Sequence, residues 1–295
     1  MQVAHRRVQR EAVPVEAGSF AAREFRIPCF PFVWHYHPEL ELTLIIKGRG
    51  LRFVGDSVQA YRDGDLCLLG ANLPHSWSSS PRPGERVHSI VVQFLPDFLG
   101  KGWLSGAEMH PIAALFERAR RGLRISGKMA QDTAERMKAL RAIPATSPRR
   151  PAQLLAILAA MAECRQCEPL AVDQALPVLT PGVHQRLSVA LDAIHQEQGE
   201  APRQAEAAEA AGMSPAAFSR FFRRHLGKPY ERYVNDVRTA HVCRALVETD
   251  KAITVIAYEA GFNNLSNFNR RFLAAKGMTP TDYRRLSRQS LPGGV

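Results

Sequence analysis

The sequence has few cysteines and no long apolar run, and these two shortages limit where the protein works. Its five cysteines, at positions 29, 67, 164, 167 and 243, are odd in number and irregular in spacing. Such a pattern is typical of a reducing compartment rather than of a disulfide framework. The longest apolar run, Leu154 to Ala162, is too short to cross a bilayer, and no apolar signal segment follows the basic N-terminus. We therefore expect a soluble, cytoplasmic protein with no membrane partner.

Acidic residues are also in short supply. The chain has 28 Asp and Glu against 39 Lys and Arg, for a formal net charge of +11 and a pI near 9.9. This excess fits a polyanionic partner such as nucleic acid. A basic composition is also common in chains rich in Arg and Ala, and the excess is spread over both halves of the sequence. Bulk charge therefore does not locate a binding site.

Cys164 and Cys167 have the spacing Cys-x-x-Cys inside a segment rich in Ala and Leu. The sequence offers no second pair that would complete a zinc ribbon. We interpret them as two ordinary helix cysteines, with a metal site or a redox pair as the alternatives.

The spacing of apolar residues divides the chain into strands followed by helices. From 20 to 95, short apolar runs such as 41–46 and 65–69 alternate with Gly, Pro or Asn, which is typical of a barrel or sandwich. From 111 the period becomes helical, with a third, strongly apolar helix over 154–167. Residues 169–181 contain three prolines and no clear period, which predicts a linker. Helices resume near 183 and continue almost to the end.

The last hundred residues contain an internal repeat. The segment 212–222, GMSPAAFSRFF, matches 261–272, GFNNLSNFNRRF, if the second copy has one extra residue. In this match Phe218 lies over Phe268 and Arg220 over Arg270. Each copy follows a short Ala-rich helical pattern, and Ser214 is a good N-cap residue for the first. Two helix-turn-helix units in tandem would place two helices in successive major grooves of a duplex.

In each copy two Phe residues four positions apart share one helix face, which we expect to pack inward. The opposite face would then enter the groove. Arg220 and Arg270 suit guanine and Asn269 suits adenine, whereas Arg223 and Arg224 are better placed to reach phosphates. The predicted DNA-binding residues are Ala216, Ser219, Arg220, Arg223, Arg224, Lys228, Leu265, Ser266, Asn269, Arg270 and Arg271.

Between the two copies, residues 229–249 have the pattern of one continuous helix. Twenty helical residues span about 30 Å, which approaches the roughly 34 Å of one DNA turn. Such a spacer would let one protein molecule contact two adjacent grooves. The alternative is a helical bundle whose basic face is merely solvated.

Residues 182–288 resemble the DNA-binding domain of the AraC/XylS family of bacterial transcription regulators. The matching segments are 208–214, 218–222, 257–262 and 277–284. The resemblance implies sequence-specific binding to double-stranded promoter DNA and contact with RNA polymerase.

The first part of the chain contains a candidate metal site. On an extended strand His35 and His37 point the same way, and Glu41 has the same parity. Together with His75, this set is typical of a divalent metal such as Zn, Fe or Mn. The alternative is that these residues line a pocket without a metal, or hydrogen-bond one another.

This spacing resembles the cupin barrel, a double-stranded β-helix, with Gly48 and Gly64 at the motif's glycine positions. The sequence departs from the motif at Cys29, Gly70, Asn72 and Ser79. We expect barrel geometry and treat metal occupancy as open. Nearby residues are candidates to contact a small effector, although each aromatic could equally belong to the core. The candidate effector-binding residues are Trp34, Glu39, Trp77 and Gln93.

The predicted fold is therefore multidomain: a cupin-like effector-sensing barrel (1–110), a helical dimerisation region (111–168), a linker (169–181) and an all-helical domain with two helix-turn-helix units (182–288). The family resemblance implies a homodimer, unless the middle helices simply pack on their own barrel. The predicted function is a transcription regulator, not an enzyme, controlled by a small molecule such as a sugar. The alternative is a metal-dependent cupin enzyme, an isomerase or dioxygenase, because its chemistry would need the same four ligands.

Overall fold

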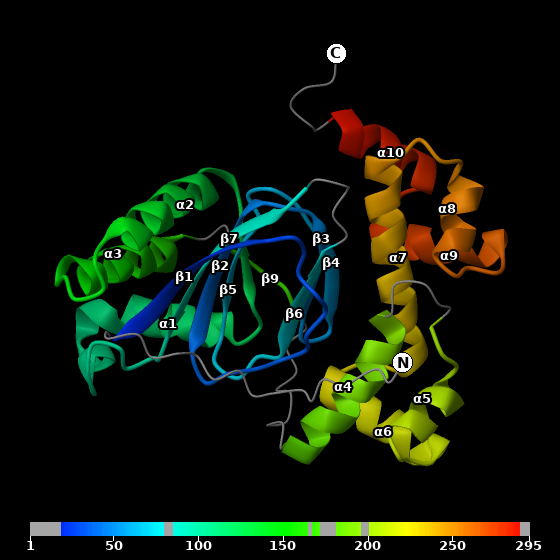
Figure 1. Ribbon diagram of the computed structural model, residues 1–295, viewed down its shortest axis with the longest axis horizontal. Helices are drawn as coiled ribbons and strands as arrows, with labels where there is room; N and C mark the ends of the chain where they lie inside the picture. Colours follow the sequence, from blue (N-terminus) through cyan, green and yellow to red (C-terminus); the bar gives the residue numbers. More distant parts are fainter. Residues whose placement is uncertain (1–18, 80–84, 165–166, 172–180, 196–200, 290–295) are drawn as a thin grey trace. The chain divides into compact units, whose positions relative to one another are not determined.

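The computed structural model describes residues 19–79, 85–164, 167–171, 181–195 and 201–289. The chain divides into two compact units, one of residues 1–57 and 61–185 and one of residues 58–60 and 186–295. Strands and three longer helices make up the first part of the chain, and helices alone make up the last part (Figure 1). An N-terminal β-domain followed by a helical domain is the fold predicted from the sequence.

Two sheets form the β-domain. The larger has the strand order β1-β7-β2-β5-β8-β9 and the smaller has the order β4-β3-β6. Where the register is described, neighbouring strands run antiparallel, as β2 does with both β7 and β5. The strands are β1 (Phe20–Ile27), β2 (Leu40–Lys47), β3 (Gly50–Val54), β4 (Ser57–Tyr61), β5 (Leu66–Leu69), β6 (His75–Ser79), β7 (Val87–Phe94), β8 (Leu123–Ile125) and β9 (Cys167–Pro169).

Strand β2 shows how the sequence separates the two faces of the larger sheet. Leu42 and Leu44 belong to the core cluster that includes the helices, whereas Ile45 belongs to a second cluster with residues of β5 and β6. Successive side chains of a strand point to opposite faces, so Glu41 and Thr43 share the face of Ile45. The polar residues of β2 therefore point between the two sheets.

Three helices cover the outer face of the larger sheet: α1 (His110–Ala119), α2 (Gly127–Ala142) and α3 (Arg149–Glu163), preceded by the 3-10 turns η1 (Trp103–Ser105) and η2 (Ala107–Met109). Their buried residues include Phe116, Met137 and Leu158, which share one core with β1, β2 and β7. The apolar faces of the middle helices thus pack on the chain's own sheet. Dimerisation stays a prediction.

The third helix begins and ends earlier in the chain than the sequence predicts, at Arg149 and Glu163 rather than at 154 and 167. Helix α3 ends at Glu163, and Cys167 begins β9, where it lies opposite Ile125 of β8. The interpretation of Cys164 and Cys167 as two helix cysteines is therefore wrong. Strand pairing to a distant part of the chain has overridden the local helical tendency. Most of the predicted linker, residues 172–180, lies outside the described residues.

In the described residues from 181 onward the helices are α4 (Pro181–His195), α5 (Gln204–Ala210), α6 (Pro215–Leu226), α7 (Tyr230–Glu248), α8 (Ile253–Glu259), α9 (Leu265–Lys276) and α10 (Pro280–Gln289). The pair α5–α6 lies at one end of α7, and the pair α8–α9 lies at the other (Figure 1). The turn within each pair contains a glycine with positive φ, Gly212 at 67° and Gly261 at 82°. Because L side chains rarely adopt this conformation, the turns explain why the repeat preserves a glycine.

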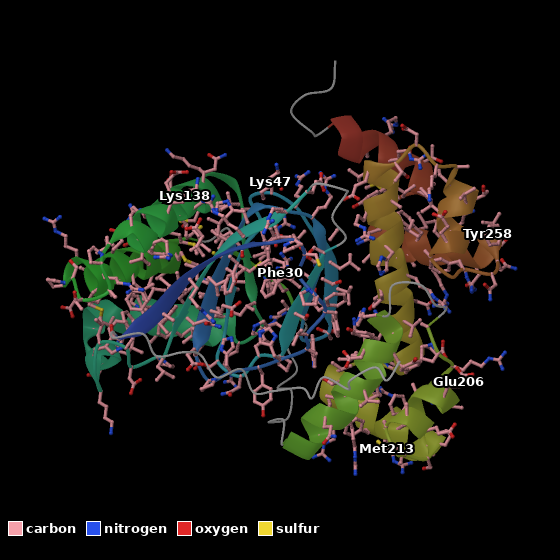
Figure 2. All side chains as sticks on the ribbon, viewed as in Figure 1. Phe30, Lys47, Lys138, Glu206, Met213 and Tyr258 are labelled. Carbon is pink, nitrogen blue, oxygen red and sulfur yellow. The ribbon has the colours of Figure 1, made fainter. Side chains whose placement is uncertain are left out.

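Helix α7 confirms the predicted spacer. Five of its apolar and aromatic residues are buried, namely Tyr230, Tyr233, Val234, Val237 and Val242. Other side chains of the helical pairs are exposed, and Tyr258 projects from α8 in this way (Figure 2).

In the described part of the chain, none of the helices is both long enough and apolar enough to cross a membrane.

Gly50 is a test of the packing between β3 and β6. A Cβ atom at this position would lie 2.0 Å from the backbone oxygen of Ser78, so Gly50→Ala forces the strands apart. We expect the free energy of unfolding, measured by urea denaturation, to fall by about 1–3 kcal/mol or more. Gly182→Ala is the matched control, because a Cβ there meets nothing within 4 Å. Equal stability of the two variants would contradict the described pairing.

Candidate functional site

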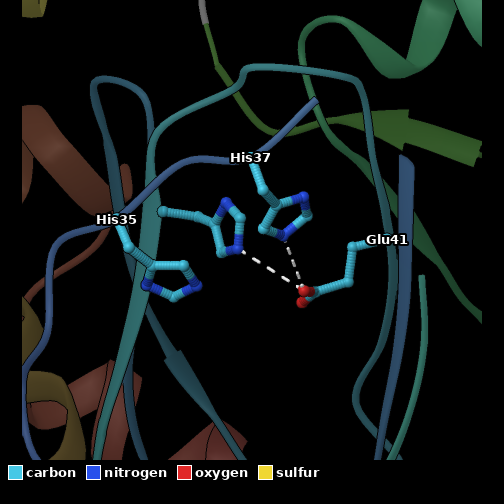
Figure 3. A group of neighbouring side chains, drawn as sticks. His35, His37 and Glu41 are labelled. Carbon is cyan, nitrogen blue, oxygen red and sulfur yellow. Dashed lines mark hydrogen bonds and ion pairs between the residues drawn. The ribbon is translucent and has the colours of Figure 1, made fainter. Parts of the chain in front are cut away.

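The four predicted metal ligands lie together between the sheets. His35 and His37 come from the segment before β2, Glu41 from β2 and His75 from the start of β6. One ligand atom from each lies within 4.8 Å of all the others, and Figure 3 shows His35 and His37 facing Glu41. Tetrahedral zinc ligands lie about 3.3 Å apart, given metal–ligand distances of about 2.0–2.1 Å. A small contraction of the cluster would therefore enclose an ion.

One detail differs from the sequence prediction. His35 and His37 do not lie on a regular strand, because the only sheet-like pairing here is an isolated bridge between His35 and His75. The backbone amide of each donates to the other's carbonyl, at 3.1 and 2.9 Å. Pro38, which has no amide hydrogen, follows directly and is a poor residue for a continuing strand. The bridge nevertheless places the two side chains beside Glu41.

Backbone carbonyls define the tautomers of the three histidines. The Nδ1 atoms of His35, His37 and His75 lie 2.8, 3.2 and 2.7 Å from the carbonyl oxygens of Val33, Glu39 and Leu73. A carbonyl oxygen only accepts, so each Nδ1 carries a hydrogen, and in the neutral imidazole each Nε2 therefore keeps a lone pair. Metal-binding histidines in proteins commonly have this arrangement.

Gln93 of β7 orients the carboxylate. Arg23 donates to its Oε1, and a guanidinium has only donors, so the amide nitrogen must point the other way. That nitrogen donates to Glu41 Oε2 at 2.9 Å and lies 3.3 Å from His37 Nε2. Thr43 donates to the other carboxylate oxygen at 2.6 Å. Arg23 and Thr43 were missed from the sequence, although Thr43 has the strand parity of Glu41.

With the histidines neutral, lone pairs of their Nε2 atoms and of the Glu41 carboxylate face one another. His37 Nε2 lies 3.1 Å from Glu41 Oε2, and His75 Nε2 lies 3.6 Å from the same oxygen. The Nε2 atom of His75 is buried and has no hydrogen-bond partner among the described residues. Burial raises the pKa of Glu41, but His75 and His37 outweigh it and hold that pKa well below its usual value. Burial and the neighbouring His35 lower the pKa of His75. A metal held by this set would require an ionised Glu41 and neutral histidines whose Nε2 atoms keep a lone pair.

A pocket that is open to solvent lies against this cluster. Phe30 lies over the barrel (Figure 2) and contributes to one wall. The apolar residues that line the pocket are Phe25, Phe30, Pro31, Val33, Trp77 and Val91. The polar residues that line it are Arg23, His35, Glu41, Thr43, Ser76 and Gln93.

Two of the four predicted effector-binding residues, Trp77 and Gln93, line this pocket, and the other two do not. Trp34 is 1% exposed and its ring stacks on Phe32, so it belongs to the core. Glu39 places a carboxylate oxygen 3.4 Å from His37 Nδ1, behind the ring rather than in the pocket. We correct both assignments. The sequence shows which residues are near the cluster but not which wall each occupies.

The predicted DNA-binding faces are exposed with two exceptions. On α6, Phe218 and Phe222 are buried and the opposite face is exposed, namely Ala216, Ser219, Arg220, Arg223 and Arg224. On α9, Phe268 and Phe272 are buried and Ser266, Asn269, Arg270 and Arg271 are exposed.

The exceptions are Leu265 and Lys228. Leu265 is half-buried and packs against the core of the second helix-turn-helix unit. Lys228 has a side chain only 14% exposed, and its ammonium group lies 2.6 Å from Asp236. Both residues are therefore engaged within the domain, and we remove them from the candidate contact surface.

Family models match both parts of the chain. The model of the AraC-like ligand binding domain matches residues 18–214, and the model of a helix-turn-helix domain matches residues 207–286. The first match covers more than half of the chain and includes the histidine cluster and the pocket.

Among curated proteins, the chain is similar to the HTH-type transcriptional regulators YobQ of Bacillus subtilis (38% identity over 77 residues, 26% of this chain and 32% of YobQ) and Rv1931c of Mycobacterium tuberculosis (37% over 87 residues, 30% and 34%). The chain spans about a third of the length of these two relatives. The HTH-type transcriptional activator RhaS of Pectobacterium carotovorum is 25% identical over 276 residues, which are 89% of this chain and 91% of RhaS.

Thr43 allows a test of the site's geometry by stability alone. Thr43→Val keeps the shape but removes the donor to a buried carboxylate, which should lower the free energy of unfolding by about 1–3 kcal/mol. Thr133→Val is the control, since this buried hydroxyl donates only to the sulfur of Met129 at 3.6 Å. Chemical denaturation of both variants checks this. If Thr133→Val lowers the free energy of unfolding as much as Thr43→Val does, the hydrogen bond from Thr43 to Glu41 does not account for the loss of stability.

Proposed function

Since this chain belongs to the AraC/XylS family of transcription regulators, we propose that it binds specific DNA sequences under the control of a small molecule held in its β-barrel. The pair of helix-turn-helix units on α7 carries this proposal. Helix α7 has 19 residues, so it spans about 28 Å, close to the roughly 34 Å of one DNA turn. One molecule would then contact two successive major grooves through α6 and α9.

The exposed side chains suit two different tasks. Arg220 and Arg270 project from the middle of their helices, opposite the buried phenylalanines, where a guanidinium can donate twice to a guanine edge. Asn269 beside Arg270 suits adenine. Arg223 and Arg224 lie in the last turn of α6 and suit phosphates, which contribute affinity without sequence choice.

The barrel pocket is the proposed effector site. The Trp77 ring and the Gln93 amide offer stacking and hydrogen bonding to a small organic molecule, of which a sugar is one class. The effector must bind one conformation of the protein more tightly than another if it is to change DNA occupancy. Contact with RNA polymerase, a homodimer and a cytoplasmic location complete the proposal, on the strength of the family resemblance.

We also propose that His35, His37, Glu41 and His75 hold one divalent metal ion such as Zn, Fe or Mn. The unpartnered, buried Nε2 of His75 and the close approach of His37 Nε2 to the carboxylate support this. When bound, such an ion would accept these facing lone pairs and offer a Lewis acid to an effector's oxygen. The same ligand set would serve a metal-dependent enzyme, but two helix-turn-helix units have no role in such an enzyme.

Substitution of three arginines separates base contacts from phosphate contacts. We expect Arg220→Ala and Arg270→Ala each to relax base preference at one position, at a cost of about 1–3 kcal/mol for the preferred sequence. Arg223→Ala should weaken binding to all sequences about equally and reduce the salt dependence. Selection from a random duplex library, followed by titrations at several salt concentrations, measures both. Equal effects of the three substitutions would overturn the assigned faces, and a flat salt response of the unaltered protein would overturn DNA binding itself.

Elemental analysis tests the metal proposal. We expect about one divalent ion per chain after purification without added metal, and less than a tenth of that in Glu41→Gln and in His75→Ala. Removal of the ion by a chelator should lower the melting temperature of the unaltered protein, because a ligand bound only to the folded state stabilises it. Arg49→Ala, at a site away from the cluster, serves as the control. A metal-free protein whose melting temperature does not respond to added Zn, Fe or Mn would exclude the site, and turnover of candidate sugars would favour the enzyme.

A further inference from the structure

We propose that Asn267 is the positioning residue of the second helix-turn-helix unit and that it makes α9 more selective among DNA sequences than α6. This inference rests on the proposed DNA-binding function and names a residue that neither the repeat nor the family match assigns. It starts from the hydrogen bonds on the exposed face of α9.

Asn267 holds two arginines at once. Its Oδ1 accepts from Arg270 Nη2 at 3.1 Å and from Arg271 Nε at 3.0 Å. The spacings of three and four residues put all three side chains on neighbouring positions of one helix surface. Asn267 itself is half-buried and its backbone amide donates to the N-cap residue Asn264 at 2.9 Å, so it lies in the fixed first turn of α9.

The bonds restrict side chains that are otherwise long and mobile. An arginine loses rotamer freedom when it binds a base, at about 0.5–1.5 kcal/mol for each immobilised side chain. If Arg270 is already oriented in the free protein, less of this cost falls on the complex. An oriented guanidinium also presents its two donors in one direction, which penalises a base that offers a different pattern.

The first helix-turn-helix unit has no side-chain acceptor at the position of Asn267. Phe218 corresponds to Phe268 in the repeat, so Ala217 corresponds to Asn267 and has no side-chain acceptor. The local structure is otherwise equivalent, since the Ala217 amide donates to the N-cap Ser214 at 3.4 Å. Arg220 makes no hydrogen bond or ion pair with any residue that the structure describes. The corresponding arginines of the two helices therefore differ, because Arg270 is hydrogen-bonded to its own helix and Arg220 is not.

The test uses two reciprocal substitutions in the full-length protein. Asn267→Ala removes the acceptor, and alanine occupies the same place in the first unit without preventing a helix. Ala217→Asn introduces the acceptor three residues before Arg220. Binding to a duplex selected by the unaltered protein is measured, along with binding to duplexes altered at the positions contacted by α6 or by α9. Melting temperatures are recorded for every variant.

We expect Asn267→Ala to reduce discrimination at the α9 positions about 3- to 10-fold, with discrimination at the α6 positions and the melting temperature unchanged. We expect Ala217→Asn to increase discrimination at the α6 positions about 2- to 5-fold. Asn263→Ala, an exposed asparagine in the turn before α9, is the control and should leave both unchanged.

Three results would overturn the inference: equal discrimination in Asn267→Ala and the unaltered protein, a loss spread evenly over all positions, or a loss that follows a fall in melting temperature. These results differ from failure of the proposed function, in which the unaltered protein would itself show no preference among duplexes. If Asn267→Ala gives the expected loss but Ala217→Asn does not increase discrimination at the α6 positions, the orienting role of Asn267 remains. The statement that an asparagine alone transfers this role to α6 is then refuted.

Discussion

Helix α7 is the constraint on which the arrangement of the two helix-turn-helix units depends. Its first half supplies Tyr230 and Tyr233, whose rings pack on Phe222 of α6 at centroid distances of 5.2 and 5.7 Å. Its second half supplies Val242 and Leu246 to the core that contains Phe268 and Phe272. One helix is therefore part of two hydrophobic cores. Burial along most of its length, rather than helix propensity, keeps it intact and fixes the separation of α6 and α9.

A comparable constraint operates in the β-domain, where alternation along β2 and β7 determines what lies inside. Glu41 and Gln93 are direct cross-strand partners, and both point between the sheets because their neighbours Leu42 and Val92 are needed against the helices. A buried carboxylate is costly unless it is well hydrogen-bonded or paired. Thr43 and Gln93 each donate a hydrogen bond to it.

The parts that could be predicted from sequence are those controlled by local spacing. The two helix-turn-helix units and the helix between them follow from a period of 3.6 residues and from one close internal match, and the four residues of the cluster follow from the spacing that resembles the cupin motif. The errors arise where distant segments meet. Cys167 pairs with Ile125 across more than forty intervening residues, and Trp34 stacks in the core rather than in the pocket. Lys228 lies in the turn before α7 and pairs with Asp236 of that helix. No local pattern contains these contacts.

The internal repeat is informative in two different ways. The paired phenylalanines and the turn glycines, which the copies share, belong to the core and the turn of each helix-turn-helix unit. Positions at which the copies differ can serve recognition. Ala217 against Asn267, and Phe221 against Arg271, are differences of this kind on equivalent surfaces. The Asn267 bonds show that the second copy uses them together, because the asparagine holds the very arginine that the first copy lacks. Similarity within the repeat thus identifies the fold, and divergence within it indicates how the two halves of one binding surface differ.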